Sequence, residues 1–156
     1  MAVWGKVGVF LHEVSVALHE KSKKTLVGDG SYAGFVNAVL REVPQARGPE
    51  RDVYGYLIYA QTGPSVQRRT SDILPGDVIT LYDAKLKGHK GLGIYHQHVG
   101  EGEVCVGVVN EFEAKKSKVR VLQANQHVGH QTVENVSYRL DDLKSGMIKI
   151  YRVLEA

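Results

Sequence analysis

The fold is decided by residues 72–126, which begin Asp72-Ile73-Leu74-Pro75-Gly76-Asp77-Val78-Ile79-Thr80-Leu81. Two further apolar runs follow, 104–109 (VCVGVV) and 118–125 (KVRVLQAN). All three runs are rich in β-branched residues and are bounded by Gly, Pro or charged clusters, which predicts β-strands. The polar linker 113–117 joins the second and third runs and is short enough for an antiparallel hairpin.

Two amphipathic helices are predicted before this stretch. Apolar residues recur at three- and four-residue steps from Val3 to Leu18 and form one helical face. Within that face, Trp4 is expected to be a core anchor rather than a ligand platform. After the turn at 28–30, Ser31 is a good N-cap for a second helix, and Pro44 is expected to end it.

The rest of the chain predicts further strands. Residues 133–138 and 147–154 alternate between apolar and polar side chains, and 140–146 between them predicts a turn or a single helical turn. The aromatic run 53–60 fits either a strand or a short helix. Residues 83–103, rich in Gly and His, are expected to form a long loop, and such loops are usually functional or mobile. Helices followed by antiparallel strands indicate an α+β fold, with the helices packed on a sheet or partial barrel.

The composition fits one domain spanning residues 1–156. A chain of this length buries roughly 70% of its unfolded surface, so neither a disulfide nor a metal is needed to explain its stability. Its 43% hydrophobic and 24% charged residues are ordinary for a globular protein. The chain starts almost directly inside a predicted helix, which indicates a domain of a longer protein.

The charge pattern weakens several functional classes. The net charge is +3 and the isoelectric point is near 8.9. The basic residues form short clusters in predicted loops or element ends, which favours solvated turns over phosphate or acidic-lipid binding, and a membrane-surface role stays the weaker alternative. These clusters lack interleaved aromatic residues, which argues against a nucleic-acid-binding module. They lie at 21–24, 68–69, 85–90 and 115–118.

A cytoplasmic location is expected. The single cysteine, Cys105, excludes an internal disulfide and fits a reducing compartment. Lys6, His12 and Glu13 interrupt the apolar N-terminal residues well before the length of a signal peptide or a membrane span.

The order of helix, Pro-Gly-Asp strand and hairpin resembles the papain-like fold of NlpC-type peptidases and CHAP-type amidases. In those enzymes a nucleophilic Cys opens a helix, a His begins a strand and a polar third residue lies on the next strand. The arrangement is chemically sensible because a helix N-terminus lowers a thiol pKa and the imidazole takes its proton.

The resemblance implies a degenerate site. Aligning 31–36 with the helix start places Tyr32 where the nucleophile would be, Cys105 where the base would be, and Gln123 or Asn125 at the orienting position. At neutral pH a phenol is roughly 0.1% ionised and a thiol roughly 3%, and a thiol cannot shuttle protons as an imidazole does. We therefore expect an inactive cleft, covered by the 83–103 loop, that serves as a binding surface.

The alternative is a working cysteine hydrolase with Cys105 as nucleophile and His96 or His98 as base. A buried strand cysteine that behaves as a small hydrophobe is the favoured interpretation. Aligning His98-Val99-Gly100 with the His-Val-Gly motif of the enzymes would still leave the nucleophile missing.

A zinc site can also be imagined from two histidine pairs. His96 and His98 lie two residues apart, and His127 and His130 lie three apart. No carboxylate or second cysteine occurs at matching spacing, so neither a metal nor a cofactor is expected.

A closer resemblance covers nearly the whole chain through three pieces: 54–64 (YGYLIYAQTGP), 87–92 with 95–100 (KGHKGL and YHQHVG) and 137–146 (SYRLDDLKSG). They are similar to the C-terminal cysteine-peptidase-like domain of a family of fungal actin-patch proteins that interact with the myosin tail region. The resemblance implies a place in cortical actin patches during endocytosis, where such proteins restrain myosin-I and actin nucleation. It implies scaffolding or recognition of a protein or peptide partner from the actin and endocytic machinery.

Overall fold

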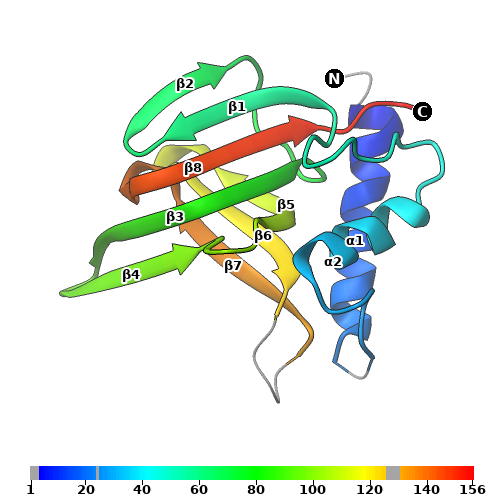
Figure 1. Cartoon of the computed structure of the whole chain (residues 1–156), viewed down its shortest axis with the longest axis horizontal. Coiled ribbons are helices and arrows are strands. Elements are labelled where there is room, and N and C mark those ends of the chain that lie inside the picture. Colours follow the sequence, from blue (N-terminus) through cyan, green and yellow to red (C-terminus); the bar gives the residue numbers. More distant parts are fainter. Residues whose placement is uncertain (1–3, 24, 126–130) are drawn as a thin grey trace.

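A curved antiparallel β-sheet carries two helices at one end (Figure 1). The computed structural model describes residues 4–23, 25–125 and 131–156. A π-helical turn, Trp4–Gly8, leads into α1 (Val9–Lys21), and α2 (Tyr32–Arg41) follows. The strands of the described residues are β1 (Tyr56–Thr62), β2 (Ser65–Arg69), β3 (Val78–Lys90), β4 (Gly93–Val99), β5 (Cys105–Glu113), β6 (Lys118–Ala124), β7 (Val133–Arg139) and β8 (Leu143–Arg152). Short 3₁₀ turns at Ala114–Lys116 and Leu140–Asp142 precede β6 and β8.

The long strand β3 organises the sheet, whose order is β2-β1-β8-β3-β5-β6-β7. One edge of β3 pairs with β8. The other edge pairs first with β5, as far as Leu81↔Cys105, and then with β4, from Ala84↔Val99 to Lys90↔Gly93. Asp83 has a positive φ of 43°, and the β3–β8 register shifts beside it, so the strand bends at this point. The α+β prediction, with helices on a partial barrel, is confirmed.

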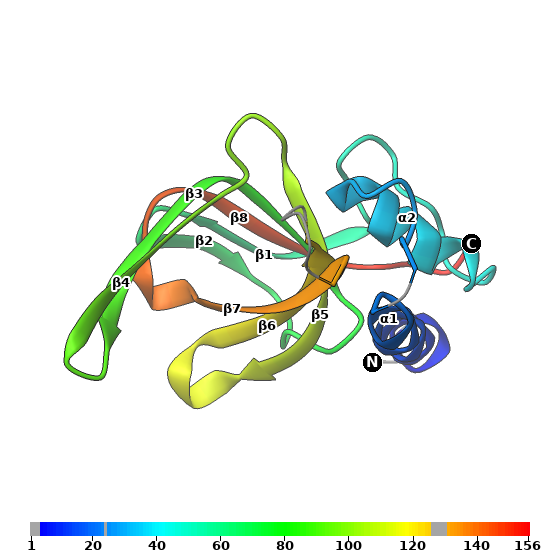
Figure 2. The ribbon, with the colours of Figure 1, turned by 90° about the horizontal axis from the view of Figure 1, so that it is seen from below.

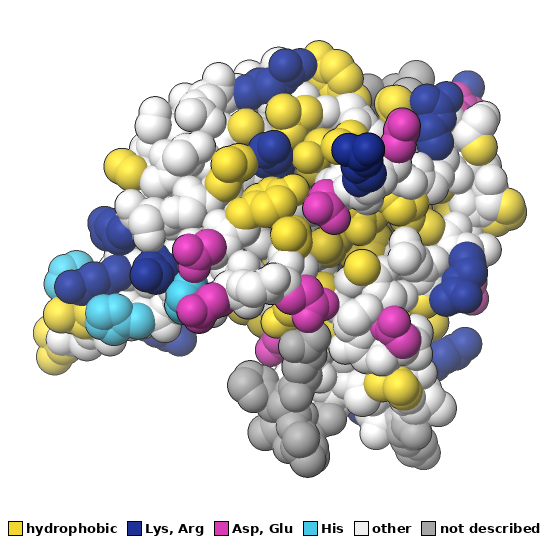
Figure 3. Space-filling model, viewed as in Figure 1, with side chains coloured by type: hydrophobic (Ala, Val, Ile, Leu, Met, Phe, Trp, Pro, Cys, Tyr) yellow, Lys and Arg dark blue, Asp and Glu magenta, His cyan; other side chains and the backbone are white. Residues whose placement is uncertain are grey.

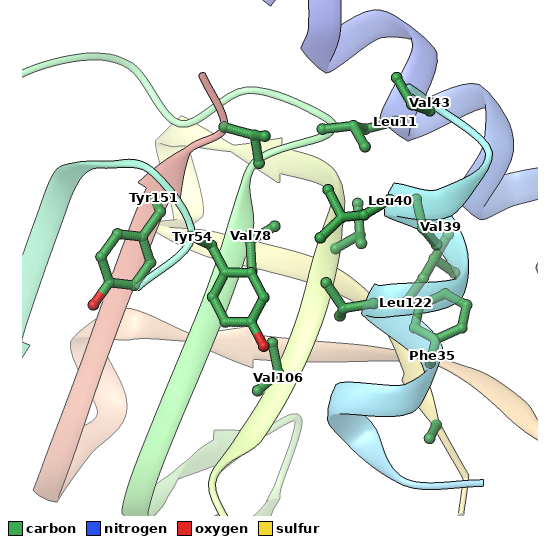
Figure 4. Close-up of a cluster of buried hydrophobic side chains, with 14 of the residues drawn as sticks. Leu11, Phe35, Val39, Leu40, Val43, Tyr54, Val78, Val106, Leu122 and Tyr151 are labelled. Atoms are coloured by element: carbon green, nitrogen blue, oxygen red, sulfur yellow. The ribbon is translucent and has the colours of Figure 1, made fainter. Parts of the chain in front are cut away.

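Helix α2 starts and packs as its sequence predicts, whereas Phe10 on the predicted apolar face of α1 is 42% exposed. The hydroxyl of Ser31 caps α2 by accepting a hydrogen bond from the Gly34 N–H at 2.9 Å, and the Asp29 carboxylate accepts from Ser31 in turn. Figure 4 shows the apolar stripe of α2, including Phe35 and Val39, directed at the sheet. The indole N–H of Trp4 donates to the Pro75 carbonyl at 2.7 Å and holds the first turn against the loop before β3.

The sheet has two buried faces and therefore two cores. One core lies between the helices and the sheet, and the other fills the inside of the curl. Strand β5 serves both, because Val106 and Val108 pack towards the helices while Cys105 and Val109 pack inside. This explains why β5 begins with five consecutive buried residues rather than an alternating pattern.

A buried ion pair joins the start of β3 to the end of β8. Arg152 binds the Asp77 carboxylate through Nε at 2.7 Å and Nη2 at 3.1 Å, and Nη2 also donates to the Asp72 carbonyl at 2.7 Å. Burial raises the pKa of the Asp77 carboxyl, while hydrogen bonds from Arg152 and the Leu74 N–H oppose that rise. The Asp-Ile-Leu-Pro-Gly-Asp segment is thus fixed to the sheet by charge as well as by packing.

The expectation of a long loop at 83–103 is wrong. Most of it is a β-hairpin, the β3–β4 arm (residues 84–99), which extends away from the helices (Figures 1 and 2). Its strand pattern is obscured in the sequence because glycines and polar side chains occupy both faces towards the tip. The ambiguous run 53–60 contributes β1, and β8 begins at Leu143 rather than at Met147.

Both ends of the described chain lie on the side of the helices, away from the arm (Figure 1). Lys6 forms an ion pair with Glu155 at 3.6 Å, and Glu155 forms a β-bridge with Ala46. Within the described residues, none of the helices is both long enough and apolar enough to cross a membrane.

Candidate functional site

Tyr32 is the first residue of α2 and stands where the helix meets both cores. Its ring is partly buried and packs against the helix-side cluster and the inner cluster. Burial raises the pKa of the Tyr32 phenol to about 12, and the nearby Cys105, Glu134 and Glu103 act in the same direction. The phenol therefore keeps its proton at neutral pH.

Cys105 begins β5 and is fully buried, with 0% of its surface exposed. Its thiol donates a hydrogen bond to Gln123 Oε1 at 3.5 Å. Burial raises the pKa of the Cys105 thiol to about 12, with smaller contributions from Glu134 and Glu103. A sulfur in this state is neither accessible nor ionised, which are the two properties a nucleophilic cysteine needs.

Gln123 occupies the centre of the site on β6 and is only 3% exposed. Its Oε1 also accepts a hydrogen bond from the Tyr138 hydroxyl at 2.7 Å, and its Nε2 donates to Glu134 Oε2 at 3.1 Å. Cys105, Gln123, Glu134 and Tyr138 thus form one hydrogen-bonded set, the Gln123 network. A carboxamide does not exchange protons near neutral pH, so this network orders the site without offering a base.

Sequence reasoning missed Tyr138 and Glu134. The β6–β7 register places Glu134 directly opposite Gln123, and burial raises the pKa of the Tyr138 phenol well above its ordinary value. The one available signal was Gln123 itself, a polar residue between the buried Leu122 and Ala124 of an apolar strand. A buried polar residue of this kind requires hydrogen-bonding partners from neighbouring strands.

Asn125, the other candidate for the orienting position, follows the last residue of β6. Its backbone N–H donates to the Thr132 carbonyl at 2.9 Å, which continues the pairing between the ends of β6 and β7. The structure therefore brings Tyr32, Cys105 and Gln123 together, with Asn125 two residues along the strand from Gln123.

His96 and His98 lie on β4, in the arm, and the structure does not bring them to the sulfur. His98 pairs with Lys85 of β3, whereas Cys105 pairs with Leu81, up to roughly 13 Å away along an extended strand. The two ring nitrogens of His98 contact Asp83 at 2.5 Å and Glu101 at 3.3 Å. These carboxylates hold the imidazole on the outside of the barrel.

Metal ligation has no support in the described part of the chain. Across residues 4–23, 25–125 and 131–156, no group of three or more His, Cys, Asp or Glu side chains is placed to hold a metal ion. His127 and His130, which formed half of the imagined zinc site, lie outside these residues.

A surface groove runs beside α2 and is bordered by the turn before the helix and the loop after it. Its volume is about 780 Å³, and we call it the α2 groove. The charged and amide side chains Asp29, Asn37 and Arg41 line it together with Gly48 and Pro49 of the following loop. These side chains carry hydrogen-bond donors and acceptors that can pair with a peptide backbone.

Comparisons with known proteins agree with this architecture. The AIM3/BBC1 cysteine proteinase-fold domain matches residues 1–156. SH3 domain-containing protein C23A1.17 of Schizosaccharomyces pombe is 33% identical over 133 residues, which cover 83% of this chain. The match spans only 8% of that relative's length. No solved structure matches the chain.

Proposed function

Because the chain belongs to the AIM3/BBC1 cysteine proteinase-fold domain family, we propose that it is a non-catalytic papain-like domain that binds a protein partner within a longer actin-patch regulator. One observation carries the proposal: Tyr32, Cys105 and Gln123, which the resemblance to cysteine hydrolases places at the catalytic positions, lie together around a buried thiol. The Cys105 thiol donates its hydrogen bond to a carboxamide, which cannot take the proton as an imidazole would.

Magnitudes support a non-catalytic site. With a pKa of about 12, the Cys105 thiol is ionised in roughly one molecule in 10⁵ at pH 7, against roughly 3% for an ordinary thiol. A general base contributes about 10²–10⁴ in rate to reactions of this type, and the residue that contacts the sulfur is an amide. The low ionisation of the thiol and the missing base both impair the same step, the formation of the thiolate nucleophile.

The binding role is supported by the SH3 domain for which the fission-yeast relative is named. Such domains recognise proline-rich peptides. A protein that joins a peptide-recognition domain to a domain of this family fits a scaffold of the endocytic actin machinery, located in the cytoplasm at cortical actin patches. We assign the α2 groove as the peptide-binding surface.

The first test addresses chemistry. Purified protein is assayed against peptide, amide and ester substrates beside Cys105→Ser. We expect no turnover above background for either protein. Turnover that disappears in Cys105→Ser would establish the rival function, a cysteine hydrolase.

The second test addresses binding in cells. The matching region of the fission-yeast relative is replaced by this chain, by the chain with Arg41→Glu, or by the chain with Cys105→Ser, and cortical patch lifetimes are measured by microscopy. We expect Arg41→Glu to mimic loss of the domain and Cys105→Ser to behave as the unaltered chain. Lys115→Glu, the same charge reversal on an exposed lysine outside the groove, is the matched control. Normal lifetimes with Arg41→Glu would remove the groove from the proposal.

A further inference from the structure

The tip of the β3–β4 arm exposes apolar side chains that the fold does not use. Gly91 and Leu92 form the two-residue turn between the paired residues Lys90 and Gly93, and Gly91 supplies the positive φ that such tight hairpin turns require. Leu92 is 109% exposed relative to its reference value, and Ile94 beside it is 60% exposed. A single exposed leucine is ordinary, but here two neighbouring apolar residues stand at the end of a projecting hairpin.

Behind this tip the arm is basic. No acidic residue occurs between Asp83 and Glu101, while Lys85, Lys87 and Lys90 lie in this stretch together with His89, His96 and His98. Figure 3 shows Lys and His side chains gathered over the arm, with apolar side chains at its end. Lys144 of β8 adds a further charge, because it lines the same two surface grooves as Lys87.

The nearby carboxylates are already engaged. Asp83 and Glu101 hold His98 at the base of the arm, and Asp142 accepts a hydrogen bond from the Tyr95 hydroxyl at 2.5 Å. Among the described residues, no ion pair involves Lys85, Lys87 or Lys90. Lys85 interacts electrostatically with Asp83, whereas Lys87 and Lys90 are available to an anionic partner.

We propose that the β3–β4 arm docks on an anionic membrane surface, with Leu92 and Ile94 inserted at the acyl boundary and the lysines among the headgroups. The order of side chains along the arm matches the order of layers in a bilayer interface, with the apolar residues outermost and the basic residues behind them. Lysine stems can lie along apolar surface while their ammonium groups stay with the phosphates. This function is separate from the proposed peptide site, because the arm and the α2 groove share no residue.

An acidic protein segment fits the same features less well. Such a partner would be bound by the lysines and would leave Leu92 in water, because the side chain projects from the apex of the turn. A bilayer uses both features, since it presents negative charge above a continuous apolar layer. Dependence on Leu92 therefore distinguishes the two partners.

The test is co-sedimentation of the purified chain with vesicles of phosphatidylcholine alone or containing 20% phosphatidylserine, in 0.1 M salt. We expect binding to the phosphatidylserine vesicles and little to the neutral ones. Two double variants should each lower the partition coefficient about tenfold or more. One removes the apolar tip (Leu92→Asp/Ile94→Asp), and the other reverses two lysines (Lys87→Glu/Lys90→Glu). Two matched controls change the same residue types outside the arm and should bind as the unaltered chain does. They are Leu26→Asp, at a leucine that is 60% exposed, and Lys115→Glu/Lys116→Glu.

A second measurement reports insertion directly. Leu92→Cys is labelled with an environment-sensitive dye; the buried Cys105 should stay unlabelled under native conditions. We expect a blue shift of the dye on phosphatidylserine vesicles and none on neutral vesicles.

Three results would overturn the proposal: no vesicle binding by the unaltered chain, binding that needs the lysines but survives Leu92→Asp/Ile94→Asp, or vesicle binding without a blue shift. The second result would show attraction to the headgroups by charge alone, without insertion of the tip. Circular dichroism of the tip variants checks that they fold, as their exposed positions predict.

Discussion

At the scale of single residues, the chemistry of the site depends on Gln123. A histidine on β6 could accept the Cys105 proton, whereas the carboxamide only receives a hydrogen bond from it. The sequence was sufficient to place Tyr32 at a helix start and Cys105 on a strand, because caps and β-branched runs are local signals. It could not reveal the contacts of Tyr138 and Glu134, which depend on the register between β6 and β7.

The raised pKa of Cys105 predicts its alkylation behaviour. At pH 8 a thiol with a pKa of about 12 is ionised about a thousandfold less than one at about 8.5. We expect iodoacetamide to modify the folded chain at least a thousandfold more slowly than the urea-unfolded chain. The rate should rise steadily with pH from 7 to 10, and a rate that levels off above about pH 9.5 would show an ordinary, accessible thiol instead.

The Asp77–Arg152 pair predicts a large stability effect. Asp77→Ala leaves a buried guanidinium without its carboxylate, which costs about 3–5 kcal/mol in proteins where such pairs have been broken. Urea denaturation of Asp77→Ala, Arg152→Met and the double variant measures the coupling. We expect the double variant to be more stable than Asp77→Ala, and a loss below about 1 kcal/mol in Asp77→Ala would contradict a buried pair.

At the scale of elements, the sequence predicted correctly those features that depend only on residues close together in the chain. The Ser31 cap, the apolar stripe of α2 and the β5–β6 hairpin follow from neighbours in the sequence. The β3–β4 arm was missed because both of its faces carry polar or charged residues towards the tip, so alternation is lost although the backbone pairing continues to Lys90↔Gly93. Its pairing needs only a tight turn, and Gly91 provides it.

The cap of α2 gives a prediction at this scale. Ser31→Ala removes the acceptor of the Gly34 N–H and should lower the free energy of unfolding by about 1 kcal/mol. Thr25→Ala is the matched control, because its exposed hydroxyl donates to the Lys21 carbonyl and caps no helix start. Equal losses in the two variants, measured by urea denaturation, would show that the cap is not formed.

At the scale of the whole molecule, helices followed by antiparallel strands were enough to predict an α+β fold. The sequence allowed a partial barrel but could not assign the side chains of β5 to its two cores, because inner and outer residues of that strand are equally apolar. That second core is also why polar groups on the inner face, such as the Cys105 thiol and the Tyr138 hydroxyl, have raised pKa values.

These buried groups predict alkaline sensitivity. Burial raises the pKa values of Cys105, Tyr32 and Tyr151 to about 12, above those of the unfolded chain, near 8.5 for a thiol and 10 for a phenol. Their contribution to stability is therefore complete below about pH 8.5 and is lost as pH rises towards 12. Urea midpoints should fall between pH 8.5 and 11. Cys105→Ser should lose less between pH 8.5 and 10, and identical profiles would contradict the assignment to the thiol.

The shared position of the two ends of the described chain has a mechanical consequence. Lys6 and Glu155 are joined at one pole of the molecule, and the β3–β4 arm extends from the other (Figure 1). Any chain attached at either end would pull from the same anchor point, the Lys6–Glu155 corner, which leaves the arm free on the far side. The domain would then pivot as a rigid body about that corner, and the tip of the arm would sweep the widest arc. Such a geometry suits a probe that searches a nearby surface while its tether stays behind.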